Sequence, residues 1–411
     1  MKTMAHVGPI LAALKKHKAG AILIALQIAL TLAISTNALC IIQDRVARVD
    51  RPTGMVESNL LTIRGDRIGR SAQELRPLID ADLHALRQLP GVEAATEMSS
   101  FPLGEDSWPE GIRLDPAARD RIARSELYFV DEQALPVVGA RLVAGRMFTA
   151  DDIRAMDEET MAWPAQAILT KALADKVYPD GSALGKPFYI GNNSPTPTTI
   201  IGIVDHLQAS WSRADSYDYM DHATLLPATL TRSSTTYLLR VRPGDMERIM
   251  QEAPAALASL DRMRVFQGIH TFEDVREEVY RSDRGMATLM GAISLTLLLI
   301  TAAGIFGLTS FWVEQRRKQI GIRRALGATR ADIVQYFLTE NLLIAVGGIA
   351  LGGVLAVGLN VLLMGSFELN RISLAVIVAG MAILLAVGQA AVLVPAVRGS
   401  RVPPVEAIRS A

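Results

Sequence analysis

Four long stretches without a charged residue interrupt the alternation of hydrophobic and polar positions along this chain. Each stretch is 25–29 residues long. A helix needs about 20 predominantly apolar residues to cross the hydrocarbon core of a bilayer. We therefore predict four transmembrane helices, which span residues 19–43, 285–313, 341–367 and 372–397.

The first of these stretches follows a basic segment at residues 15–18, as the apolar core of a secretory signal does. That apolar core has about 7–15 residues, whereas this stretch has 25. Cys40 also allows a lipobox-like interpretation, but Ile41 and Ile42 continue the apolar run beyond it. We favour an uncleaved membrane anchor over either cleaved signal.

The segment between the first two stretches, residues 44–284, alternates short β-branched runs with helical patterns, and Pro- and Gly-containing turns separate them. Strands are expected at residues 59–63, 127–130, 167–170, 188–190, 198–204 and 236–241. Helices are expected at residues 77–89, 131–138, 171–177, 246–260 and 271–284. The predicted fold class is a membrane α-helical protein with a large α+β domain of two lobes between its first two transmembrane helices.

Apolar residues continue beyond two of the transmembrane stretches at helical spacing. Val46 and Val49 follow the first stretch, and Phe272, Val275 and Val279 precede the second. We predict two helical stalks that leave the membrane and meet along these apolar stripes. Frayed helix ends are the alternative.

Charge is segregated along the chain, although the net charge is zero. Residues 44–284 carry 28 basic and 37 acidic side chains, and the remainder carries 14 basic and 5 acidic ones. Basic residues beside spans favour the cytoplasm. We therefore expect the large domain outside the cell. The expected segments between the spans are a cytoplasmic N-terminus at 1–18, a cytoplasmic loop at 314–340, a short external connector at 368–371 and a cytoplasmic tail at 398–411.

Motifs for catalysis or metal binding are missing from the sequence. The run PDGSALGKP at 179–187 lacks the spacing of a phosphate-binding loop and is predicted to be a turn. His206 and His222 each follow an aspartate, but such pairs are common on surface loops, and we predict no metal site. The acidic runs at 151–152 and 157–159 lack the spacing of a calcium loop. No catalytic residue is predicted, and the chain is not expected to be an enzyme.

The transmembrane stretches themselves contain no ionisable side chain, which argues against coupling to a proton or ion gradient. The single cysteine excludes a disulfide within the chain. Gly348 and Gly352 form a G-x-x-x-G pattern, which favours close packing of the third helix against a neighbour.

The loop at 314–340 begins with the dense basic run EQRRKQIGIRRALGAT. We predict a short helix over residues 315–326 that ends at Gly327, a residue suited to the left-handed position after a helix. Thr329 can cap the next helix, with Asp332 three residues later as an approximate capping box. A loop that only anchors the topology by its positive charge is the alternative.

This run resembles the signature of FtsX-like, MacB-type ABC transporter permeases, approximately V-x-E-R-x-x-E-I-G-I-R-R-A-L-G-A-T. The match is continuous from Ile320 to Thr329, whereas Gln319 replaces the usual glutamate. The closing run VPAVRGSRVPPVEAIRS and the segments at 145–152, 167–179 and 184–207 are also similar to that family.

The resemblance implies a permease in the bacterial inner membrane, with a periplasmic large domain and cytoplasmic termini. It implies a dimer of identical or homologous permease chains, a cytoplasmic ABC ATPase subunit as partner, and possible assembly with a periplasmic adaptor and an outer-membrane channel. No cofactor is expected on this chain, since ATP and Mg²⁺ would bind to the ATPase. Nucleic acid is not expected as a partner, and membrane lipid is.

The implied function is ATP-driven export by mechanotransmission, in which ATP hydrolysis moves the periplasmic domain to expel a peptide, an antibiotic or a siderophore. An FtsX-like regulator of a cell-wall hydrolase, a lipoprotein-releasing permease and a ligand receptor without an ATPase are the alternatives. The residues expected to couple to the ATPase share the basic run: Arg316, Arg317, Ile320, Gly321, Ile322, Arg323, Arg324, Ala325, Leu326, Gly327 and Thr329.

Overall fold

The computed structural model describes residues 18–98, 100–156, 162–191, 195–210, 218–367 and 371–403. The chain divides into two compact units. The membrane unit comprises Met1–Asp50 and Ser282–Ala411, and the extramembrane unit comprises Arg51–Arg281. Four expectations lie partly or wholly outside the described residues: the N-terminal segment 1–17, the acidic run 157–159, the connector 368–370 and the tail 404–411.

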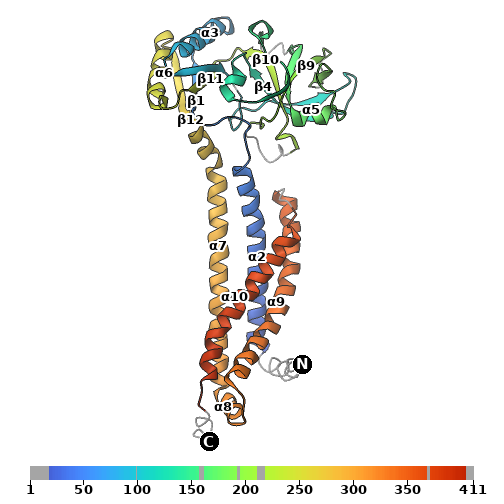
Figure 1. The fold of residues 1–411 in the computed structure, drawn as a ribbon, viewed down its shortest axis with the longest axis vertical. Helices are drawn as coiled ribbons and strands as arrows, with labels where there is room; N and C mark the ends of the chain where they lie inside the picture. The colour runs from blue at the N-terminus through green and yellow to red at the C-terminus, as the bar shows by residue number, and fades with distance from the viewer. Residues whose placement is uncertain are drawn as a thin grey trace. The chain divides into compact units, whose positions relative to one another are not determined.

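Four long apolar helices build the membrane unit (Figure 1). They are α2 (Lys18–Val49), α7 (Phe272–Gln315), α9 (Arg330–Phe367) and α10 (Leu374–Ser400). The first three contain a predicted charge-free stretch completely, and α10 contains the fourth from residue 374 onward. Each helix is long and apolar enough to cross a membrane. The short helix α8 (Arg317–Ala325) lies between α7 and α9.

Small residues let α9 approach α2 closely. A Cβ atom on Gly348 would lie 2.7 Å from the carbonyl oxygen of Ala25, and one on Gly352 would lie 2.9 Å from the Cα of Ala29. Any larger side chain at either position would therefore clash with the α2 backbone. Asn37 adds a polar contact, because its Nδ2 donates to the carbonyl oxygen of Ala356 at 3.1 Å.

Polar contacts also join α2 to α7. The Nε2 of Gln27 donates to the carbonyl oxygen of Ile300 at 3.0 Å, and the hydroxyls of Thr31 and Thr301 lie 2.8 Å apart. In an apolar solvent such groups are satisfied only by the protein, so these uncharged side chains hold neighbouring helices together.

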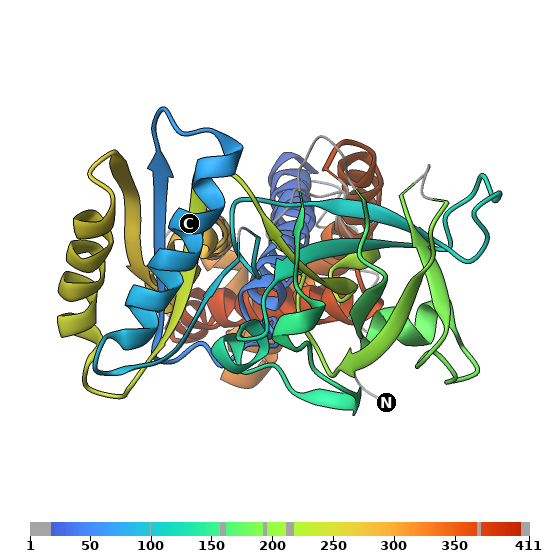
Figure 2. The same ribbon diagram turned by 90° about the horizontal axis from the view of Figure 1, so that it is seen from above.

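The extramembrane unit contains a four-stranded antiparallel sheet with the order β12-β1-β11-β2. Helices α3 and α6 pack on one face of this sheet, where their apolar side chains form one core with β1 and β11. In Figure 2, α3 is the blue helix and α6 is the olive helix. Each helix connects two strands that have another strand between them, which is the split β-α-β arrangement of ferredoxin-like folds. The elements are β1 (Leu60–Arg67), α3 (Ala72–Gln88), β2 (Val92–Glu97), β11 (Ser234–Val241), α6 (Met246–Leu260) and β12 (Arg264–Thr271).

A second sheet is inserted in the chain between β2 and β11, and six of its strands close into a ring. Each strand pairs with the next in the order β4-β3-β8-β9-β7-β10, and β10 pairs with β4 to complete the ring. The strands are β3 (Pro109–Arg113), β4 (Ala123–Val130), β7 (Gln166–Thr170), β8 (Pro187–Ile190), β9 (Thr198–Val204) and β10 (Ala223–Leu230). Closure removes the exposed edges that an open sheet would have.

Shorter elements surround this ring. Strand β5 (Leu142–Gly145) pairs with β9, and β6 (Arg154–Met156) pairs with β10. The helices are α4 (Ala134–Val138), α5 (Lys171–Val177) and the single turn η2 (Ala150–Asp152). Leu173, Ala174 and Val177 of α5 join the buried core of the ring.

The predicted fold class is confirmed, with two sheets as the two predicted lobes. Helices α5 and α6 have the predicted bounds. Helix α4 begins three residues later than expected, because Asp131 accepts hydrogen bonds from the Gln133 amide and from Thr96 instead of opening the helix. Strands β2, β3, β5, β6, β10 and β12 were not predicted.

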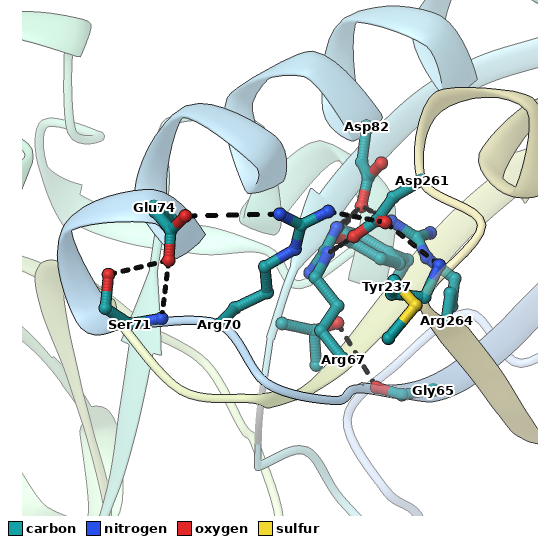
Figure 3. A network of polar contacts seen from close by, with 11 residues as sticks. Gly65, Arg67, Arg70, Ser71, Glu74, Asp82, Tyr237, Asp261 and Arg264 are labelled. Atoms are coloured by element: carbon teal, nitrogen blue, oxygen red, sulfur yellow. Dashed lines mark hydrogen bonds and ion pairs between the residues drawn. The ribbon is translucent and has the colours of Figure 1, made fainter.

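A buried network of charged and phenolic groups ties the four-stranded sheet to its helices (Figure 3). Asp82 of α3 accepts from Arg67 at the end of β1, from the Tyr237 hydroxyl of β11 and from Arg264 at the start of β12. Asp261, the residue after α6, lies 3.7 Å from the guanidinium of Arg67. These five side chains are almost fully buried.

The geometry of this network keeps Tyr237 as a donor. Burial and the neighbouring Asp82 carboxylate raise the pKa of Tyr237, so the hydroxyl stays protonated at neutral pH. The Asp82 carboxylate therefore has two cations and one neutral donor around it. Removal of that carboxylate would leave two buried guanidinium groups without their shared partner.

We predict that Asp82→Asn lowers the free energy of unfolding of the extramembrane unit by about 3–5 kcal/mol, the cost of breaking a buried ion pair from one side. Pulse proteolysis of the purified chain across a urea series measures the change. The control is Asp80→Asn, on the same helix, because Asp80 forms an exposed pair with Arg76. Equal midpoints for the two variants would contradict a structural role of the network.

Burial also changes the titration of Glu97 at the end of β2. Desolvation and the nearby Asp131 raise its pKa to about 8. In the unfolded chain the same group loses its proton near its ordinary pKa of 4.5. Because the folded state holds the proton more tightly, stability is highest at low pH and falls as the pH rises from about 4.5 to about 8.

We expect the melting temperature of the wild-type extramembrane unit to fall between pH 5 and pH 8, and Glu97→Gln to flatten that dependence, because the amide stays neutral throughout. For the free energy of unfolding, one such group gives a limiting slope of about 1.4 kcal/mol per pH unit. Differential scanning fluorimetry measures the melting temperature at each pH, with the exposed Glu93→Gln of the same strand as control. A Glu97→Gln variant with the full wild-type slope would show that Glu97 is ionised when folded.

Candidate functional site

The basic run folds as a helix that is sharply separated from its neighbours. Helix α7 ends at Gln315, and α8 begins at Arg317. At its other end the Ala328 amide donates to the carbonyl oxygen of Arg323 at 3.1 Å, and the Gly327 amide donates to that of Arg324 at 3.2 Å. With Gly327 at φ 100°, this is a Schellman motif. The predicted glycine stop is confirmed.

Helix α9 begins with the predicted capping box. The Asp332 carboxylate accepts from the backbone amide of Thr329 at 2.8 Å, and the Thr329 hydroxyl accepts from the Asp332 amide at 3.2 Å. The two residues thus satisfy donors at the start of the helix that the helix itself cannot satisfy. Together with Gly327, this cap fixes the turn from α8 into α9.

A buried ion pair anchors α8 to α9. The Nη1 of Arg316 lies 2.9 and 2.8 Å from the two carboxylate oxygens of Glu340. Arg316 is 7% exposed and Glu340 is 2% exposed. The ring of Trp312, one turn earlier on α7, lies 5.9 Å from the Arg316 guanidinium. Arg316 was expected to face a partner, but its carboxylate partner lies within this chain.

Other members of the expected coupling set also pack inside the membrane unit. Ile320 and Gly321 are buried, and Ile320 belongs to an apolar cluster that includes Ile333 and Phe337 of α9. The Nη1 of Arg324 donates to the carbonyl oxygen of Ser400 at the end of α10. These contacts orient one face of α8 toward α9 and α10.

The opposite face of α8 presents apolar side chains to solvent. Ile322 is 46% exposed and Leu326 is 84% exposed. Arg317 and Lys318, one to two turns earlier, are exposed on the same short helix. Ala325, Thr329 and Arg323 are exposed as well, and the Arg323 guanidinium lies over the Tyr336 ring at 4.8 Å. The candidate site therefore consists of the exposed apolar side chains of Ile322 and Leu326 with basic side chains around them. It lies at the end of the bundle where α2 begins and α10 ends (Figure 1).

The residues of the predicted stalks lie in different surroundings. Val46 is 45% exposed and Val49 is partly buried. Phe272 is fully buried, with its ring centroid 6.4 Å from that of Phe101. Val275 and Val279 line a groove of the extramembrane unit. The contact of the two valine stripes stays a prediction.

An ion pair that the sequence analysis missed joins the two helices near the predicted stalks. Arg45 of α2 pairs with Asp283 of α7, and Asp283 is largely buried. Each residue lies just outside a charge-free stretch. The sequence did contain a signal for this ion pair, because the two opposite charges lie at the same end of two predicted spans.

The extramembrane unit shows ordinary structural roles for the residues considered for chemistry. Lys186 of the 179–187 run lies 3.3 Å from Asp180 within the turn, and His206 bonds to the carbonyl oxygen of Pro52 at 2.9 Å. No cluster of three or more metal-ligating side chains occurs among the residues that the structure describes.

We predict that Glu340→Gln loosens α8 while the long helices stay folded, because the buried Arg316 loses its charged partner. Hydrogen–deuterium exchange should be faster over 317–326 and unchanged in the middle of α2. The matched control is Glu314→Gln, since Glu314 pairs with Arg317 at 3.2 Å on the surface. Equal protection of 317–326 in both variants would contradict the anchoring role of the buried pair.

Two protein families match this chain. Residues 21–256 match the MacB-like periplasmic core domain, and residues 291–404 match the FtsX-like permease C-terminal domain. The first match covers more than half of the chain. It includes the extramembrane unit up to α6, and the second covers α8 with the helices on both sides of it.

Known proteins agree with these matches. The macrolide export ATP-binding/permease protein MacB of Neisseria gonorrhoeae (strain ATCC 700825 / FA 1090) is 27% identical over 295 residues, which are 69% of this chain and 43% of the relative. MacB of Shewanella oneidensis is 24% identical over 419 residues, which are 97% of this chain and 59% of the relative. The chain thus spans about half the length of the curated relatives it matches.

Among solved structures, the periplasmic region of MacB from Actinobacillus actinomycetemcomitans is similar to this chain with a TM-score of 0.36 and 15% identity. The similarity covers 56% of this chain and 97% of that structure. The four apolar helices and the periplasmic core domain describe an inner-membrane protein with a periplasmic domain. The chain belongs to the family of FtsX-like ABC transporter permeases that carry a MacB-like periplasmic core domain.

Proposed function

We propose that this chain is the permease subunit of an ATP-driven exporter and that α8 is where a cytoplasmic ATPase subunit binds. The observation that carries the proposal is the exposed pair Ile322 and Leu326 on a helix that is anchored from its other side. An exposed leucine on a surface surrounded by cations fits a groove with an apolar floor and acidic edges. ATP and Mg²⁺ would bind to that ATPase and not to this chain.

The anchoring supports the proposal that force applied at α8 reaches the rest of the chain. The Arg316–Glu340 pair, the buried Ile320 and the contact of Arg324 with α10 connect α8 to α9 and α10. A movement imposed on α8 by the ATPase would therefore move these helices with it. A loosely attached loop would absorb the same movement.

Helix α7 offers a path from the membrane to the periplasmic core domain. It runs without interruption for 44 residues, which corresponds to about 66 Å at 1.5 Å per residue. Its first ten residues belong to the extramembrane unit and the others to the membrane unit. We propose that ATP-driven motion at α8 is transmitted along this helix, with the termini in the cytoplasm.

Export, in preference to regulation of a cell-wall hydrolase or lipoprotein release, is supported by the relatives named above as macrolide export proteins. We propose a dimer of permease chains as the working unit, with a periplasmic adaptor and an outer-membrane channel as further partners. The four charge-free stretches offer no charged side chain for coupling to an ion gradient, which supports the proposal that the cargo is moved by the periplasmic domain.

We predict that Leu326→Glu reduces ATPase capture at least tenfold, because it places a charge in the centre of the apolar contact. The measurement is co-purification of the permease with its ATPase, identified by mass spectrometry, followed by ATP hydrolysis in nanodiscs. The control is Leu260→Glu, since Leu260 is 44% exposed on the extramembrane unit. Wild-type capture by Leu326→Glu would exclude α8 as the binding site, and the lack of any ATPase with the wild-type chain would favour a receptor.

A further inference from the structure

A groove of the extramembrane unit lies on the face of the four-stranded sheet opposite α3 and α6, and has a volume of about 610 Å³. Thr62 of β1 and Thr236 of β11 contribute to its floor. One wall is the loop 101–106, and the other is the first turns of α7. The volume falls within the range of sites that bind drug-sized molecules.

The walls of the groove are partly apolar. Phe101 and Leu103 line it from the loop, and Val275 and Val279 line it from α7. The two valines, four residues apart, share one helix face. The Phe101 ring lies in a tilted arrangement against Phe272 of α7, with 6.4 Å between the ring centroids, and so connects the two walls. An apolar ligand would thus find surface on both sides.

The charges around the groove are mostly negative. Its lining contains five carboxylates and two guanidinium groups: Glu105, Asp106, Asp274, Glu277, Glu278, Arg64 and Arg281. Arg64 pairs with Glu105 at 2.7 Å, and Arg281 pairs with Glu278. Arg64 also lies 3.7 Å from Asp106. The lining nevertheless contains three more carboxylates than guanidinium groups. Their combined field favours a cationic ligand.

The loop wall is held in place without a ligand. Glu126 of β4 accepts from the Trp108 amide at 2.6 Å and from the Ser107 hydroxyl at 2.9 Å. The Ser100 hydroxyl closes the loop by donating to the carbonyl oxygen of Asp106 at 2.8 Å. A preformed wall lowers the entropic cost of binding.

We propose that this groove binds organic cations that carry an apolar body, with the body between the loop and α7 and the positive charge facing the excess carboxylates. A role of such cations as exported cargo rests on the exporter function proposed above, whereas binding itself does not depend on it. The apolar walls and the excess carboxylates select the ligand class together. An anion would be repelled by the carboxylates, and a small hydrophilic cation would not fill the space between the apolar walls.

Tetraphenylphosphonium and tetraphenylborate test the proposal, because they have nearly the same shape and opposite charge. We expect the full-length chain in nanodiscs to bind tetraphenylphosphonium saturably and more tightly than tetraphenylborate, after subtraction of partitioning into empty nanodiscs. The double variant Asp106→Asn/Glu277→Gln removes two of the carboxylates and should weaken tetraphenylphosphonium binding about tenfold. Added salt should weaken wild-type binding as well.

The control variant is Glu247→Gln, which removes an exposed carboxylate from α6, on the other face of the sheet. It should bind like the wild type. Equal affinity for the two probes, or equal affinity of the double variant and the wild type, would overturn the proposal. Binding that emerges only when the protein is diluted would assign the groove to a second copy of the chain and would also overturn it.

This measurement needs no ATPase, so its failure leaves the function assigned to α8 intact. Conversely, a permease that captures no ATPase but binds tetraphenylphosphonium through Asp106 and Glu277 would retain the groove assignment. The two proposals therefore fail separately.

Discussion

A single ion pair, buried where the apolar bundle ends, determines which side chains of α8 are exposed on the surface. Arg316 and Glu340 lie in an environment with little water, where opposite charges attract strongly and an isolated charge is costly. Because the pair fixes the start of α8 against α9, the remaining turns of the helix have little choice of orientation. Ile320 points into the bundle, and Ile322 and Leu326 are left outside. The exposed apolar surface is thus a consequence of the buried charge.

The four spans, the turn at Gly327 and the start of α9 follow from local chemistry and were predicted: a charge-free stretch defines a span, and Gly-Ala-Thr with Asp332 defines a helix end and a start. The break at Arg316 was not predicted, because the expected helix began at Gln315, which belongs to α7. Which cations face inward was not predicted. The sequence shows six similar basic residues, and only the rotation of α8 about its axis distinguishes Arg316 from Arg317. That rotation depends on Glu340, which is 24 residues away.

The extramembrane unit shows the same division between local and distant information. The helical period of α5 and α6 is visible in the sequence, and both were predicted with their observed bounds. Strand β12 was missed because its exposed and partly buried positions contain charged and polar residues with little apolar contrast. Closure of the ring through β10 and β4 joins segments about 100 residues apart, and the groove combines side chains from five separate segments. No local pattern encodes such pairings.

The position of the groove bears on how a permease of this kind could respond to a ligand. Val275 and Val279 line the groove, and both lie on the helix that ends just before Arg316. A ligand shifts a conformational equilibrium only as far as its affinity differs between the two states. If ATP-driven motion at α8 turns or shifts α7, the width of the groove changes, and the affinity for its ligand changes with it. By linkage, an occupied groove then favours one state of α8. Because α7 lines the groove and leads directly to Arg316, such coupling would need no charged residue in the four charge-free stretches.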